Sequence, residues 1–166
     1  MEINFEREFT TIDQILSSIQ IEELNIYNQA YLNLETPMIR TKVLHEGTKS
    51  EKHVSFPVNG DFNGVVAAFL DTFGKEMSTE DNQLLDSLFV ESMNILLGRL
   101  FTKIEKISDL NILLGSPNVN SKISLNALKK GSHSLTYSIG YKLLFNAKEF
   151  NCRIVVILTK NKITEV

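Results

Sequence analysis

The feature that most constrains this fold is a long run of helical apolar periodicity in the middle of the chain. The run opens at "MSTEDNQLL", where Ser78 with Asp81 three residues later predicts a capped helix start. Apolar residues then recur at helical spacing as far as Ile107. A helix of this length is roughly 40 Å long at about 1.5 Å per residue. So long an amphipathic helix in one small domain needs a broad apolar surface to cover.

One side of the predicted helix is apolar along its whole length. With about 100° between successive residues, one arc gathers Phe89, Met93, Leu96, Leu97, Leu100, Phe101, Ile104 and Ile107. This arc is expected to pack on a sheet. Gly98 is a candidate bend within the helix.

The first half of the chain is expected to hold a helix and three strands. Apolar residues at helical spacing predict a helix from Thr10 to about Asn33, and "PMIRTKVLHEG" after it predicts a strand. The turn dipeptides Asn59-Gly60 and Asn63-Gly64 in "HVSFPVNGDFNGVVAAFLDTFG" predict a hairpin. Pro57 indicates that its strand lies at an edge or contains a bulge.

The second half repeats this pattern after its long helix. "LNILLGSP" predicts a short buried strand, and "SLNALKKGS" a single helical turn that stops at Gly131. "HSLTYSIGYKLLF" and "CRIVVILTK" predict two further strands, joined by the turn "NAKEFN".

The predicted fold class is therefore α+β, built from two helix–three-strand units. Their boundary falls near Gly74, which gives pseudo-repeat halves of about 1–74 and 75–166 within a single domain, 1–166. We expect an antiparallel-rich sheet covered on one face by two long helices.

Composition excludes several classes of function. The formal net charge is −3 and no basic patch is evident, which argues against binding to nucleic acid. No stretch reaches the roughly 18 apolar residues of a membrane span, and the charged start "MEINFEREF" is unlike a signal peptide, so the cytoplasm is expected. The single cysteine, Cys152, is expected in a buried strand. The three histidines are scattered and no metal site is expected.

A narrow polar stripe interrupts the long helix outside its apolar arc. Ser87, Glu91, Asn94, Gly98 and Glu105 share it. Such residues commonly only face solvent. However, Asn is a mediocre helix former and Gly in a helix interior costs about 1 kcal/mol relative to Ala. An amide can hold a water molecule and direct it at an electrophile, while a carboxylate can pair with a cation on a partner. Such a pair would catalyse by positioning, with metal and charge supplied by the other molecule.

The spacing of this stripe resembles a family signature. Ser87, Glu91 after three residues, Asn94 after two more and Pro117 after another 22 match the motif of the CheC/CheX family of chemotaxis phosphatases at all four positions. "FPVNGDFNGVVAAFLDTF" is similar to the hairpin that precedes the motif helix in that family. "HSLTYSIGYKLLF" and "CRIVVILTK" are similar to its last two strands.

The resemblance implies a function and a role for each residue. Members dephosphorylate the aspartyl phosphate of CheY-type response regulators, so a phosphorylated CheY-like regulator is the expected partner. Asn94 would orient the attacking water and Glu91 would pair with the active-site lysine of the regulator. Mg²⁺ would belong to that partner, and no cofactor is expected on this chain. Ser87 and Pro117 would be structural. Apart from the resemblance, the missing side chain at Gly98 leaves room for the surface of another protein, so Gly98 and Ser87 are assigned to the partner contact.

The sequence departs from the family pattern in two places. Many CheX chains, which carry one motif and form dimers, have an extra short helix where this chain has only "GKEMSTEDNQ". Ser18, Glu22 and Asn25 also repeat the core of the motif, with Thr48 in place of the proline. CheC chains carry two motifs, and some of them bind the deamidase CheD. The repeat at Glu22 and Asn25 could be a second site, a relic of the duplication or a coincidence, and the sequence leaves all three open. It also leaves open whether the chain forms a homodimer.

Two alternatives to catalysis also stay open. The chain could be a module of the same fold that binds a response regulator without hydrolysing its phosphate. It could also be a dimeric scaffold.

Overall fold

The computed structural model describes residues 2–18, 24–26, 30–41, 51–119 and 134–159. Two helices and seven strands lie within these ranges, in the order α1 (Glu2–Ser18), β1 (Leu24–Ile26), β2 (Ala30–Arg40), β3 (Glu51–Gly60), β4 (Asn63–Asp71), α2 (Thr79–Ile107), β5 (Ile112–Leu114), β6 (Ser134–Phe145) and β7 (Lys148–Thr159).

The seven strands form one sheet in the order β1-β2-β6-β7-β4-β3-β5, and every neighbouring pair is antiparallel. If β2 is exchanged with β5, β3 with β6 and β4 with β7, the order of these six strands is the same read in the opposite direction. The strands of the two halves therefore interleave about the central β4–β7 pair. Within the described ranges β1 has no counterpart in the second half, and the first half holds four strands where three were predicted.

Both central hairpins have local causes in the sequence. The predicted β3–β4 hairpin is confirmed, and Gly60 in it has φ +119°, where an added Cβ would lie 2.2 Å from the Asn111 carbonyl oxygen. β6 and β7 are joined by Asn146 and Ala147, whose φ angles of 51° and 59° are those of a type I′ turn. β7 therefore begins at Lys148, and the turn is shorter than predicted.

Pro57 occupies an outward-facing backbone position in β3. Its carbonyl accepts a hydrogen bond of 2.7 Å from the Gly115 N–H, on the side of β3 away from β4. Backbone N and C=O of one strand residue point to the same side, so the N–H that Pro57 lacks is not needed for the β4 ladder.

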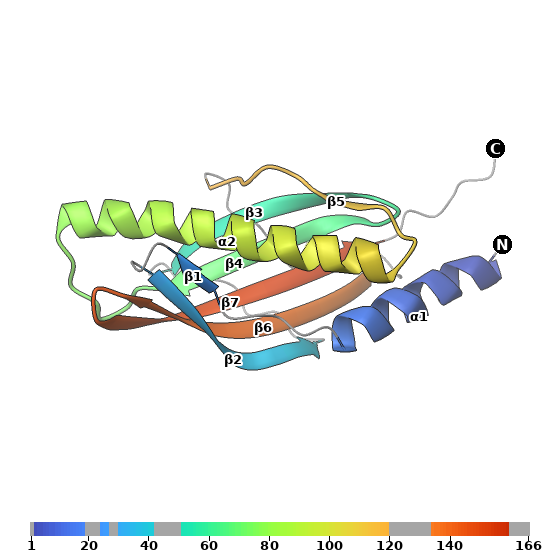
Figure 1. Cartoon of the computed structure of the whole chain (residues 1–166), viewed down its shortest axis with the longest axis horizontal. Helices are drawn as coiled ribbons and strands as arrows, with labels where there is room; N and C mark the ends of the chain where they lie inside the picture. The colour runs from blue at the N-terminus through green and yellow to red at the C-terminus, as the bar shows by residue number, and fades with distance from the viewer. Residues whose placement is uncertain (1, 19–23, 27–29, 42–50, 120–133, 160–166) are drawn as a thin grey trace.

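The long helix α2 lies across one face of the sheet (Figure 1). It starts as predicted, with the Ser78 side chain accepting a hydrogen bond from the Asp81 N–H. It is continuous through Gly98. Its buried residues are Leu85, Leu88, Phe89, Ser92, Met93, Leu96, Leu97, Leu100, Phe101 and Ile104. The predicted apolar arc is therefore right except at Ile107, which is 64% exposed at the helix end.

The prediction of a sheet covered by two long helices is wrong. The first helix, α1, runs from Glu2 to Ser18, not from Thr10 to Asn33. Ile12, Ile15 and Leu16 are buried in the core, but α1 extends beyond the end of the sheet instead of lying across it (Figure 1). Among the residues that the structure describes, α2 is the helix that covers the main face.

The predicted helix fails because its second part has the period of a strand. Ala30 and Leu32 are buried and Leu34 is partly buried, while Asn33 and Glu35 between and after them are exposed. This alternation belongs to β2, which starts well before the strand predicted at Pro37. The predicted helical turn at 124–132 and the end of the predicted strand at 42–47 lie outside the described residues.

Asp13 attaches α1 to the sheet. The Tyr137 hydroxyl on β6 donates a hydrogen bond to the Asp13 carboxylate, and Arg40 on β2 lies 3.7 Å from it. Burial, and then the hydrogen bond to Asp13, raise the pKa of Tyr137 well above its usual value. The contact between α1 and the sheet is therefore polar as well as apolar.

Candidate functional site

The polar stripe predicted from the sequence lies on the solvent side of α2. Ser87, Glu91 and Asn94 are exposed, and Gly98 is half-buried. The buried side of α2 consists of other residues, so none of the four is needed to fill the core. The helix therefore presents them together on one open face.

Glu91 and Asn94 are free to contact another molecule. In the described part of the chain, neither side chain has a hydrogen bond or an ion pair. Side chains three residues apart on a helix have Cβ atoms about 5–6 Å apart, so one ligand can reach both. The Ser87 hydroxyl, by contrast, is turned back toward the Gln83 carbonyl at 3.4 Å.

Gly98 has no structural reason to be glycine. It lies inside a regular helix without a positive φ, and a Cβ added there would meet nothing within 4 Å. The Gly98 carbonyl accepts a 2.8 Å hydrogen bond from the Thr102 hydroxyl, which any residue at 98 would allow. The residue therefore forgoes about 1 kcal/mol of helix propensity without a gain within the fold.

The helix that carries the stripe is firmly positioned. The Lys52 ammonium on β3 lies 2.5 Å from the Asp86 carboxylate, next to Ser87. Buried Ser92 donates its hydroxyl to the Leu88 carbonyl within the helix. These contacts and the broad apolar side hold α2 in place, so Glu91 and Asn94 are presented from a rigid element.

The other predicted site residues lie on other elements or outside the described residues. Pro117 is exposed in the segment after β5, next to Asn118, whose backbone pairs with Ser55 of β3. For the repeated motif, Asn25 lies in β1 and Glu22 lies outside the described residues. The helical spacing that suggested a second site is therefore absent at Asn25.

Sequence reasoning missed one member of the stripe. Leu84 is on α2 three residues before Ser87, and it is 42% exposed. Positions 84, 87, 91, 94 and 98 continue one spacing of alternating three and four residues. This spacing could have revealed Leu84, which the predicted apolar arc did not include.

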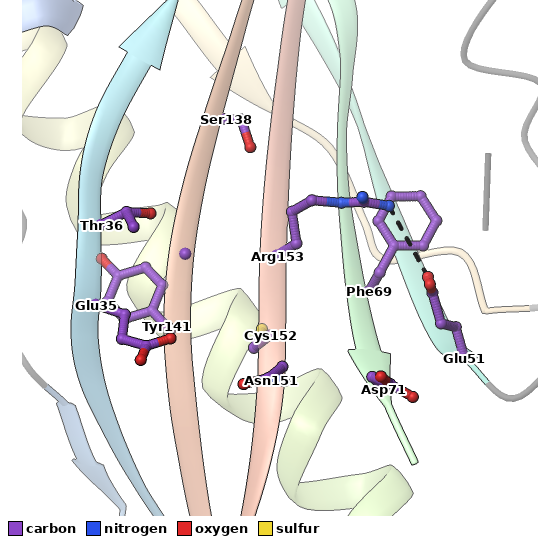
Figure 2. Close-up of a pocket in the computed structure, with 11 residues that line it drawn as sticks. Glu35, Thr36, Glu51, Phe69, Asp71, Ser138, Tyr141, Asn151, Cys152 and Arg153 are labelled. Atoms are coloured by element: carbon purple, nitrogen blue, oxygen red, sulfur yellow. Dashed lines mark ion pairs between the residues drawn. The ribbon is translucent and has the colours of Figure 1, made fainter. Parts of the chain in front are cut away.

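A separate pocket of about 340 Å³ lies on the sheet (Figure 2). Figure 2 shows it from the face opposite α2, with the Arg153 side chain extended over Phe69 toward Glu51. The guanidinium is 5.1 Å from the Phe69 ring centre and 4.0 Å from the Glu51 carboxylate. The pocket contains none of the predicted site residues. No sequence motif marks it, because its lining comes from five strands.

Three further observations concern metal ions, membranes and the single cysteine. No group of three or more His, Cys, Asp or Glu side chains within the described ranges is placed to hold a metal ion. In the same part of the chain, no helix has the length and apolar character to cross a membrane. Cys152 is buried as predicted, and burial raises its pKa to about 12.

The comparisons with known proteins give a likeness in structure but none in sequence. No family model and no curated protein matches the sequence. Among solved structures, the fold is similar to a chain of the CheX–CheY–BeF3–Mg²⁺ complex from Borrelia burgdorferi. The two chains are 11% identical, the match covers 92% of this chain and 94% of the other, and the TM-score is 0.42.

Proposed function

We propose that this chain is a phosphatase that hydrolyses the aspartyl phosphate of a CheY-type response regulator. The observation that carries the proposal is the joint exposure of Glu91 and Asn94 on the open face of α2, with neither side chain paired within the described structure. The match of Ser87, Glu91, Asn94 and Pro117 to the CheC/CheX signature gives this geometry its chemical interpretation.

In the proposed reaction, Asn94 accepts a hydrogen bond from a water molecule and aligns it with the phosphorus atom. The water oxygen attacks phosphorus while the bond from phosphorus to the aspartyl oxygen breaks. The products are inorganic phosphate and the free aspartate of the regulator, and the water proton leaves with phosphate or solvent. Neither Asn94 nor Glu91 forms a covalent bond, so catalysis comes from position.

Glu91 serves the encounter between the two proteins. Its carboxylate pairs with the active-site lysine of the regulator, which places Asn94 opposite the phosphoryl group. The partner also supplies the Mg²⁺. Ser87 and Gly98 lie at the margins of this contact, Ser87 with its hydroxyl turned back toward the Gln83 carbonyl and Gly98 with no side chain.

The test follows loss of the acyl phosphate from a regulator of the source organism, with and without this protein. Wild type should shorten the lifetime of the phosphate at catalytic concentrations. Glu91→Ala should lower kcat/KM about tenfold or more, since it removes a charge pair at the contact. Asn82→Ala is a matched control, because Asn82 is exposed on the opposite side of α2. Decay at the spontaneous rate for every regulator would reject the phosphatase proposal.

The same experiment separates the non-catalytic alternatives. Tight binding to the phosphorylated regulator without faster decay would identify a binding module. Absence of both binding and hydrolysis would leave only a scaffold role.

A further inference from the structure

The pocket on the face of the sheet opposite α2 is separate from the proposed phosphatase site. Its volume of about 340 Å³ is within the range of sites that hold small molecules. Among the described residues that line it are three carboxylates, Glu35, Glu51 and Asp71, and the guanidinium of Arg153. The proposed reaction on α2 uses none of these charged groups, so their convergence needs its own explanation.

The hollow of this pocket is created by a bulge in β2. The register between β2 and β6 shifts between Leu34 and Thr36, and the neighbours Glu35 and Thr36 both line the pocket. Opposite them Gly140 has no side chain, and an added Cβ would lie 2.5 Å from the Thr36 Oγ1. The bulge therefore requires glycine, and this glycine leaves an open floor between β2 and Arg153 of β7.

Across the pocket from the bulge, Glu51 on β3 and Asp71 on β4 are directly opposite each other (Figure 2). The backbone of Ser55 bonds to Asn118, away from β4, so Ser55 and every second residue of β3 pair with β4 without sharing a hydrogen bond. Side chains are closest at such positions, and two carboxylates there repel each other. A bound cationic group would remove this repulsion.

Arg153 compensates the carboxylate pair only in part. Its guanidinium is 4.0 Å from the Oε2 of Glu51, which is too far for a hydrogen bond, and this buried oxygen accepts none from elsewhere. Asp71 accepts one hydrogen bond, at Oδ1 from the Phe73 N–H. Within the described structure, Glu51 Oε1 and Asp71 Oδ2 accept none. These two oxygens can therefore accept hydrogen bonds from a ligand.

We propose that this pocket binds a free α-amino acid through its two opposite charges. The ligand ammonium donates to Asp71 and Glu51, and the ligand carboxylate accepts from Arg153, whose side chain is 29% exposed and stacks on Phe69. A guanidinium has five N–H donors, so Arg153 can serve the ligand and the protein together. A purely cationic ligand would face Arg153, and a purely anionic one would face three carboxylates. A molecule that carries both charges close together suits the whole lining.

The open floor at Gly140 sets a preference among amino acids. The ligand side chain lies over it toward Thr36 and Ser138, whose hydroxyls have no hydrogen bond within the described structure. A short side chain that can bond to these hydroxyls therefore fits better than a large apolar one, which would bury them without a partner.

Calorimetric titration of the whole chain with the standard L-amino acids tests the proposal. At least one with a short polar side chain should bind with a Kd below about 1 mM. Analogues of that ligand without the ammonium or without the carboxylate should bind about tenfold more weakly or worse, because each loses one charge pair. The proposal is overturned if no amino acid binds, or if the analogue with the ammonium alone binds as tightly as the amino acid.

Two substitutions establish whether the ligand occupies this pocket. Asp71→Asn removes the charge but keeps an acceptor for the Phe73 N–H, and Arg153→Lys keeps the charge but loses the planar fork of donors. Each should raise the Kd about tenfold or more. Glu149→Gln is the matched control, because Glu149 is a carboxylate on the same face of β7 outside the lining, and it should leave the Kd unchanged. A Kd that neither pocket substitution changes would place the ligand elsewhere and overturn the proposal.

Discussion

Gly98→Ala should stabilise the protein and at the same time impair its action on the regulator. The added Cβ would meet nothing within 4 Å, and the backbone at 98 is ordinary helix. The substitution should therefore recover about 1 kcal/mol of helix propensity. For a chain of 166 residues this corresponds to a rise in Tm of about 2–4 °C.

The expected loss of activity comes from the same methyl group. If the regulator packs against the bare backbone at Gly98, one extra methyl overpacks the contact at a cost of about 1–3 kcal/mol. The kcat/KM for the phosphorylated regulator should then fall by roughly 5- to 150-fold. A substitution at a residue that only faces solvent is not expected to raise the Tm and lower kcat/KM at the same time.

Thermal unfolding and the phosphate-release assay measure the two effects on one sample. Asn82→Ala serves as the control, because it also adds helix propensity on α2 but lies about 180° from Glu91. It should raise Tm and leave kcat/KM unchanged. A Gly98→Ala protein that is more stable than wild type and equally active would refute the idea that a partner contacts the backbone at Gly98. A Gly98→Ala protein that is less stable than wild type would show that the space around Gly98 is not open.

Three further predictions concern the fold. Tyr137→Phe should lower the free energy of unfolding by about 1–3 kcal/mol, since the buried hydroxyl donates to the Asp13 carboxylate; denaturant titration checks this. Burial raises the pKa of Tyr137 and Tyr141 above the unfolded value of about 10. Their contribution to the free energy of unfolding is therefore complete below pH 10 and falls as the pH rises above it toward the folded pKa values. A free energy of unfolding that stays constant from pH 9 to 11 would contradict this. The Cys152 thiol should react with a disulfide reagent at pH 8 only as fast as the protein opens, so rapid labelling of the folded protein would contradict its burial.

The long helix could be predicted because its signals are local and agree with one another. The Ser78 cap, the acidic first turn and the apolar arc all lie within α2, and the structure confirms them. The open face follows from the same periodicity, since residues outside the apolar arc must face away from the sheet. Exposure of Glu91 and Asn94 was therefore accessible from sequence alone.

The first helix was mispredicted because two periodicities join without a breaker. Ile12, Ile15 and Leu16 have helical spacing, and the alternation of β2 begins at Ala30 with neither Gly nor Pro between them. Residues apolar in both patterns, such as Ala30, fit either assignment, so tertiary pairing with β6 decides the outcome. The pocket around Arg153 was inaccessible for a different reason, because only strand register brings its lining together.

The most direct test of the central claim separates binding from chemistry in Asn94→Ala. The claim is that the Asn94 amide orients the attacking water, so the variant should bind the beryllofluoride-loaded regulator with a Kd within about threefold of wild type. Its rate of acyl-phosphate hydrolysis at saturation should fall by about 10²-fold or more. A variant that binds normally and hydrolyses the phosphate at the wild-type rate would contradict the proposed mechanism.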